Sequence, residues 1–232
     1  GVVPDDIVET IERVRESGRR AILVTGRELE DLRQAFDRLD VFDRVVAENG
    51  AVLFDPATRN ARALTEAPPP AFVDALKERA VEPLSVGHVI VATWEPHETT
   101  VIEAIHELGL ELQIIFNKGA VMVLPAGVTK ASGLAAALDE LRLSPHNVVG
   151  VGDAENDHAF LDTCELSVAV ANALPAVKDR CDYVTKGARG DGVRELCDAL
   201  LESDLEHLDD RLPRHDIVIG TAGGGEPVRV RP

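Results

Sequence analysis

Short runs of β-branched and other apolar residues alternate along the chain with longer stretches in which apolar residues recur every three or four positions. The first kind is typical of buried strands and the second of amphipathic helices. The first part of the chain therefore predicts, in order, a helix over 5–16 capped by Asp5 or Asp6, a strand over 20–24, a helix over 29–39 and a strand over 44–47. Alternation of strands and helices with short connections predicts a parallel sheet.

The same alternation returns after residue 127. The predicted helices are 130–141, 157–161, 175–180 and 192–201, and the predicted strands are 148–152, 166–170 and 182–185. Residues 1–55 and 127–202 are thus expected to form one discontinuous α/β domain.

The stretch between these two parts has a different pattern, bounded by Pro56 and by Pro68 to Pro70. A turn at 117–119 joins two of its predicted strands into a hairpin. Antiparallel strands mixed with helices predict a small α+β module over 56–126, inserted into the α/β domain. Its predicted elements are helices over 71–81 and 99–108 and strands over 86–94, 112–116 and 120–124.

Residues 203–232 read as an acidic linker and tail. Two apolar runs around a triple glycine, over 216–231, predict a hairpin that belongs to a further part of a longer protein. It is not a phosphate-binding loop, because no Gly-Lys-Ser/Thr follows the glycines.

The net charge of −17 over 232 residues argues against nucleic acid or an anionic membrane as a partner. An anionic substrate would have to meet a local positive group. No apolar run approaches the ~18 residues that a membrane span needs. The cysteines have no metal-ligand spacing and are expected to be buried free thiols of a reduced cytoplasm. They are Cys164, Cys181 and Cys197.

Polar residues end four of the predicted strands: Thr25, Asn49, Asp153 and Asn172. Lys130 begins a helix that should start at the same edge of the sheet, where α/β proteins bind ligands. A hydroxyl, an amide, a lysine and carboxylates are the groups that phosphoryl transfer requires. Each residue alone also has a structural explanation, as a helix cap, a turn residue or a solvated surface lysine.

The stretch from Val148 to Asp157 adds a candidate metal site. A buried strand ends at Asp153, and Asn156 and Asp157 follow at the start of the next helix. Two carboxylates so placed can hold a hard cation such as Mg2+. The alternative is an acidic helix start without a metal.

Taken together, these segments resemble the motifs of the haloacid dehalogenase-like phosphatases, of the Cof-type subgroup (subclass IIB, with a C2 cap). The similarity extends from about residue 1 to 201, and the small cap resembles that of archaeal-type phosphoglycolate phosphatases. The resemblance implies an α/β fold, with a three-layer, Rossmann-like parallel sheet core and an inserted small α+β cap domain. The matching segments are Leu23 to Arg27, Ala47 to Ala51, Gly127 to Lys130, Gly152 to Asp157, Val170 to Ala173 with Lys178, and Asp182 to Thr185.

The resemblance also implies roles. Thr25 would hydrogen-bond the transferring phosphoryl group, and Lys130 would neutralise it and steady the nucleophile. The substrate, a small phosphorylated metabolite such as phosphoglycolate or a sugar phosphate, would also meet Gly26, Arg27, Asn49 and Asn156. The catalytic Mg2+ would be held by Asp153 and Asp157.

One motif of that family is missing from this sequence. Its nucleophile is the first Asp of an Asp-x-Asp-Gly-Thr segment that ends a central strand, and no such segment occurs here. Without that strand, backbone groups of both neighbouring strands would be unpaired. We therefore expect a fragment of a longer chain, inactive by itself, from an active phosphatase. The alternatives are a phosphomutase of the same superfamily and a non-catalytic module of a larger protein.

Overall fold

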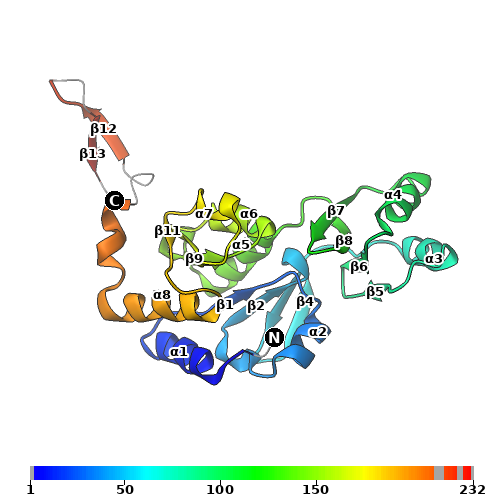
Figure 1. Cartoon of the computed structure of the whole chain (residues 1–232), viewed down its shortest axis with the longest axis horizontal. Helices are drawn as coiled ribbons and strands as arrows, with labels where there is room; N and C mark the ends of the chain where they lie inside the picture. Colours follow the sequence, from blue (N-terminus) through cyan, green and yellow to red (C-terminus); the bar gives the residue numbers. More distant parts are fainter. Residues whose placement is uncertain (1–2, 212–216, 224–226, 231–232) are drawn as a thin grey trace. The chain divides into compact units, whose positions relative to one another are not determined.

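The chain forms two compact units, residues 1–143 and residues 144–232, in a computed structural model (Figure 1). The structure describes residues 3–211, 217–223 and 227–230. Parallel strands alternate with helices in both units, so the predicted α/β class is confirmed. Among the described residues, no helix is both long enough and apolar enough to cross a membrane.

The main sheet of the first unit has the strand order β1-β2-β3-β4. β1 and β2 run parallel, with Leu23 opposite Val45, whereas β3 and β4 turn back antiparallel. Residues 60–63, which the sequence analysis places in the inserted module, pair with β3. They carry no strand pattern of their own, and only this pairing makes them a strand. The strands are β1 (Ile22–Val24), β2 (Arg44–Ala47), β3 (Val52–Asp55) and β4 (Asn60–Ala63).

The predicted helices of this part are present, with two differences at their ends. α1 begins after the extended Pro4 without a side-chain cap, so the predicted Asp cap is wrong. Asp5 and Asp6 lie in the first turn, where a negative charge favours the helix dipole. α2 is shorter than predicted because Phe36 leaves the helix in an extended conformation and contacts the ring of Phe42 edge-on. The helices are α1 (Asp5–Glu16), α2 (Leu29–Ala35), α5 (Lys130–Leu141) and the 3-10 turn η1 (Leu39–Val41).

Asp43, directly before β2, links this strand to the end of α1 and the start of β1. Its carboxylate accepts the Ala21 N–H at 2.9 Å and pairs with Arg20 at 2.9 Å and Arg15 at 3.2 Å. Burial raises the pKa of this carboxyl, but the Ala21 hydrogen bond and the two guanidinium groups outweigh burial, and the pKa is lowered overall.

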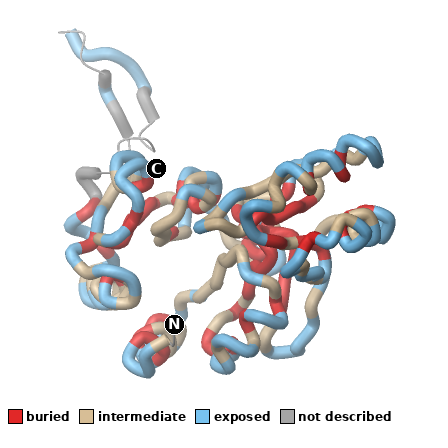
Figure 2. The backbone as a smooth tube through the Cα atoms, turned by 45° about the vertical axis from the view of Figure 1, so that its right-hand side comes forward, coloured by how far each residue is buried: buried red, intermediate tan, exposed pale blue. Residues whose placement is uncertain are grey.

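A second sheet, the cap sheet, lies in the same unit with the order β5-β6-β8-β7. One face packs against α3 and α4 through Phe72, Val101 and Val121. Figure 2 colours the chain by burial, with buried stretches in red and exposed stretches in pale blue. The other face places Met122 and Leu124 in an apolar cluster with residues of α2 and β2. The strand predicted over 86–94 is interrupted at 87–90. The elements are α3 (Pro70–Glu78), β5 (Ser85–Val86), β6 (Val91–Trp94), α4 (Glu98–Glu107), β7 (Leu112–Asn117) and β8 (Ala120–Pro125).

The second unit contains a parallel sheet of order β11-β10-β9. Leu166, Val168 and Leu196 belong to its core. Of the predicted buried thiols only Cys164 is buried, while Cys181 and Cys197 are partly exposed; none of these three described residues forms a disulfide. The elements are β9 (Val149–Gly152), η4 (Glu155–Asp157), α6 (His158–Leu161), β10 (Leu166–Ala169), α7 (Pro175–Lys178), β11 (Tyr183–Val184), α8 (Gly190–Ser203) and η5 (Glu206–Arg211).

The predicted tail hairpin is present as β12 (Ile217–Thr221) and β13 (Pro227–Val230), which pair antiparallel. The predicted ends of this hairpin, at residues 216 and 231, lie outside the described residues. Among the strands that the structure describes, β1 is paired only with β2, and β9 only with β10. Within the described part of the chain, β1 and β9 are therefore edge strands of their sheets, and an edge strand can pair with a further strand.

Candidate active site

The ends of the parallel strands β1 and β2 bring Thr25 and Asn49 together. The N–H of Thr25 donates to the Val46 carbonyl at 2.8 Å, and the N–H of Asn49 donates to the Thr25 carbonyl at 3.1 Å. A further bond runs from the Glu48 N–H to the Arg27 carbonyl at 2.9 Å. The Thr25 hydroxyl accepts the Arg27 N–H at 3.2 Å, so its own proton can point towards a ligand.

The turn after β2, residues 48–50, has a left-handed backbone throughout. The φ angles are 52° at Glu48, 55° at Asn49 and 105° at Gly50. Left-handed non-glycine residues are uncommon and carry strain, and such strain concentrates at functional sites. At Gly50 a side chain is excluded by contact as well, since a Cβ would lie 1.9 Å from the Thr129 carbonyl oxygen.

Asn49 is 1% exposed and lies between the β1 loop and the cap sheet. Its side-chain nitrogen donates to the sulfur of Met122 in β8 at 3.6 Å. On the other side, a Cβ on Gly26 would lie only 3.1 Å from the Asn49 side-chain oxygen. Asn49 is therefore the point where the cap sheet meets the strand ends of the main sheet.

Lys130 is the first residue of α5 and is only 8% exposed. Thr129 caps the helix, accepting the N–H of Ser132 at 3.1 Å, while the Ser132 hydroxyl accepts the Thr129 N–H at 3.0 Å. Because Gly50 packs on Thr129, the helix start is held against the turn that carries Asn49. The structure thus brings Thr25, Asn49 and Lys130 to one region of the first unit.

Arg27 lies in the same loop as Thr25, but its side chain is half exposed and is paired with Asp31 of α2 at 2.5 Å. The Arg27 backbone contributes to the site through the bonds described above. Its guanidinium group is held on the surface of α2.

In the second unit, Asp153 follows β9 directly, and Asp157 turns back towards it. One Asp157 oxygen, Oδ2, accepts the backbone N–H groups of Asp153 at 3.0 Å and Ala154 at 2.9 Å. Gly152 permits this turn, because a Cβ there would lie 2.8 Å from the same oxygen. Asp157 is 5% exposed, whereas Asp153 and Asn156 are partly exposed.

A cavity of about 240 Å3 lies beside Asp153. Arg189, which the sequence analysis did not consider, lines it together with apolar residues of β9 and α8. Asn172 holds this arginine's backbone, accepting the Arg189 N–H at 2.6 Å. No short sequence motif identifies Arg189, which lies beside the cavity because it directly precedes α8.

The donors in the second unit suit a hard cation. Mg2+ in proteins takes one or two carboxylates and completes its shell with water and substrate oxygens. Asp153 and Asp157 supply such carboxylates, although one Asp157 oxygen also shapes the loop. Within the described residues, no group of three or more Asp, Glu, His or Cys side chains could hold a metal ion by itself. Asp153 and Asp157 therefore fit part of a magnesium site.

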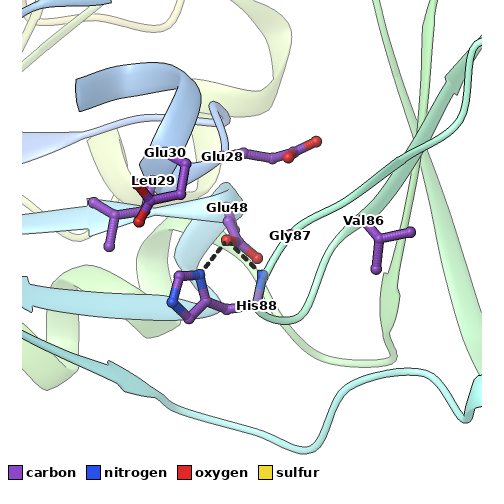
Figure 3. Close-up of a pocket in the computed structure, with 7 residues that line it drawn as sticks. All are labelled: Glu28, Leu29, Glu30, Glu48, Val86, Gly87 and His88. Carbon is purple, nitrogen blue, oxygen red and sulfur yellow. Dashed lines mark hydrogen bonds and ion pairs between the residues drawn. The ribbon is translucent and has the colours of Figure 1, made fainter. Parts of the chain in front are cut away.

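Glu48 is a further residue that the sequence analysis did not single out. Its carboxylate is fully buried and faces the segment 87–90 beside a cavity of about 280 Å3 (Figure 3). The sequence shows Glu48 as part of a turn within the segment Ala47 to Ala51, but it does not show its partners, which lie about forty residues further along the chain.

The chain is similar to known proteins in sequence and in fold. A family model described as haloacid dehalogenase-like hydrolase matches residues 1–107 and 85–196. A phosphoglycolate phosphatase of Methanothermobacter thermautotrophicus is 29% identical over 196 residues, covering 82% of this chain and 87% of that protein. One from Haloarcula marismortui is 31% identical over 190 residues, covering 78% and 84%. Among solved structures, a subclass IIB sugar phosphatase of the same superfamily matches with a TM-score of 0.62 at 18% identity, covering 86% of this chain and 91% of that one.

Proposed function

Because the chain belongs to the haloacid dehalogenase-like hydrolase family, we propose that it provides the active site of a Mg2+-dependent phosphomonoesterase. The substrate is a small phosphorylated metabolite, with phosphoglycolate as the first candidate, since relatives that cover most of the chain carry that name. A sugar phosphate is the second candidate. The net charge of −17 favours a small ligand over nucleic acid or a membrane surface. A cytoplasmic location is also proposed, because the three widely spaced cysteines show no pattern of a disulfide framework.

The observation that carries this proposal is the junction of Thr25, Asn49 and the start of α5. The Thr25 hydroxyl donates to a phosphoryl oxygen, and the buried Lys130 ammonium offsets its negative charge. Arg27 contributes through its backbone, which orients Thr25. Burial of Asn49 beneath Met122 keeps water away from this end of the site.

Asp153 and Asp157 would hold the Mg2+, with Asn156 as a nearby donor. When bound, the ion supplies charge neutralisation at the phosphoryl oxygens. We propose that the nucleophile is an aspartate outside residues 1–232, in an Asp-x-Asp-Gly-Thr segment of the longer protein. That carboxylate attacks phosphorus and forms an acyl phosphate, while the bond between phosphorus and the ester oxygen breaks and the alcohol leaves. Water then hydrolyses the acyl phosphate, which releases phosphate and regenerates the carboxylate.

Phosphate release from p-nitrophenyl phosphate and from phosphoglycolate tests the proposal, with and without Mg2+. One protein carries an N-terminal Asp-x-Asp-Gly-Thr strand, and its matched control is the chain of 232 residues. We expect Mg2+-dependent release from the first protein only. An inert extended protein refutes the phosphatase assignment, and activity of the shorter chain refutes the location of the nucleophile. Transfer that depends on a sugar bisphosphate, without net phosphate release, would indicate a phosphomutase.

A further inference from the structure

Glu48 is a fully buried carboxylate whose two oxygens are both used by the backbone of one segment. The His88 N–H donates to Oε1 at 3.0 Å, and the N–H groups of Val89 and Ile90 donate to Oε2 at 2.8 and 2.9 Å. The His88 ring nitrogen Nδ1 lies 3.4 Å from Oε1 (Figure 3). Three backbone N–H groups thus converge on this side chain.

The two ends of this contact belong to different parts of the first unit. Glu48 belongs to the turn 48–50 after β2, whereas residues 87–90 connect β5 and β6 of the cap sheet. We call the Glu48 carboxylate and the three N–H groups the Glu48 clasp. It joins the cap sheet directly to the turn that carries Asn49.

Both sides of the clasp are shaped for this contact. Glu48 follows the last residue of β2 directly and has a left-handed φ of 52°. Opposite it, Gly87 has no side chain, and a Cβ there would lie 2.8 Å from Oε1. Val89 and Ile90, each 1% exposed, pack in the same apolar cluster as Leu29 of α2. The segment 87–90 is therefore fixed to the main sheet by side chains and by backbone.

We propose that Glu48 is a positioning residue of the phosphatase, which holds the cap sheet so that Met122 covers Asn49. Its effect on catalysis rests on the proposed function, whereas its effect on the cap sheet does not. Glu48 does not contact the substrate in this proposal and acts on it only by positioning Asn49 and the cap sheet. Without the clasp, a smaller fraction of the molecules has Met122 over Asn49. The apparent affinity for the substrate is then reduced in proportion to that fraction.

The variant Glu48→Gln tests the clasp with little change in size. An amide has one acceptor oxygen and one NH2 group, so in either orientation its NH2 faces at least one backbone N–H of residues 88–90. Glu28→Gln is the matched control, because Glu28 lines the same cavity, and the bonds described above do not involve it. Gly87→Ala disturbs the same contact from the other side.

Hydrogen exchange of the 88–90 amides is the first measurement. We expect exchange to be about 10-fold faster or more in Glu48→Gln and Gly87→Ala, and unchanged in Glu28→Gln. Unchanged exchange in both clasp variants would overturn the inference. This measurement needs no activity and therefore stands even if the phosphatase assignment fails.

Steady-state kinetics of the extended protein is the second measurement. We expect KM for phosphoglycolate to rise about 10-fold in Glu48→Gln while kcat stays within about twofold, since saturating substrate restores the covered arrangement. A fall in kcat at unchanged KM would indicate a smaller folded fraction and refute a positioning role. If the wild-type protein hydrolyses no phosphate ester, the proposed function fails, and hydrogen exchange alone decides the clasp.

Discussion

Replacement of Gly50 by alanine should destabilise the first unit more than the same replacement at Gly127, which also has a positive φ. The φ of 105° places an alanine in a region that L-residues avoid, at about 1–2 kcal/mol. The new Cβ would also lie 1.9 Å from the Thr129 carbonyl oxygen, roughly 1.5 Å inside ordinary contact. Overpacking of this kind costs about 1–3 kcal/mol. We therefore expect a loss of about 2–5 kcal/mol in the free energy of unfolding.

Gly127→Ala provides the matched control, because Gly127 precedes the same helix α5 with a φ of 83° and has no atom within 4 Å of its would-be Cβ. This variant should lose only the left-handed penalty, about 1–2 kcal/mol. The effect of alanine on the unfolded chain is the same in both variants and cancels in their difference.

Urea unfolding followed by the fluorescence of Trp94, the one tryptophan of the chain, measures both variants. Trp94 lies in β6 of the same unit as both glycines, so it reports on that unit. If the two variants differ by less than about 1 kcal/mol, the contact between Gly50 and Thr129 does not fix the start of α5 as the structure indicates.

Three further predictions concern charged residues. Asp43→Asn should lower the free energy of unfolding by about 2–3 kcal/mol at pH 7. Because the folded-state pKa of Asp43 is lowered, the stability advantage of the wild type is present above the unfolded pKa of about 3.9 and is lost as the pH falls through the folded pKa. An advantage that stays constant down to about pH 2 in urea unfolding would contradict this. Lys130→Met should reduce kcat of the extended protein by about 100-fold or more. A kcat within threefold of wild type would exclude charge neutralisation by this lysine. Asp153→Asn and Asp157→Asn should each raise the Mg2+ concentration for half-maximal activity about 10-fold. Only Asp157→Asn should also lower the free energy of unfolding, by about 1–2 kcal/mol, because Oδ2 of Asp157 accepts the backbone N–H groups of Asp153 and Ala154.

Local signals in the sequence predicted most helices and strands and several of their ends. α5 begins at Lys130 and ends at Leu141 as predicted, because an apolar helical period follows a Thr-Lys start. The turn Asn117-Lys118-Gly119 predicts the hairpin of β7 and β8, and its residues Lys118 and Gly119 have positive φ. Chain order alone also placed Thr25 and Asn49 at neighbouring strand ends.

Other features depend on segments that are far apart in the sequence. The strand at residues 60–63 exists because β3 pairs with it. The Arg27 guanidinium, a substrate-side candidate by its motif, is paired with Asp31 on α2. Arg189 reaches the cavity beside Asp153 because of where α8 begins.

Glu48 is the clearest example of a residue whose contacts depend on the tertiary structure and not on the local sequence. The sequence shows a Glu-Asn-Gly turn, and periodicity and capping rules describe only a residue and its near neighbours along the chain. That the Glu48 carboxylate is buried against the N–H groups of residues 88–90 follows from packing between the cap sheet and the main sheet, which only the folded structure brings together. The chain order thus determines which polar groups end the strands, and tertiary packing determines which of them are covered and by what.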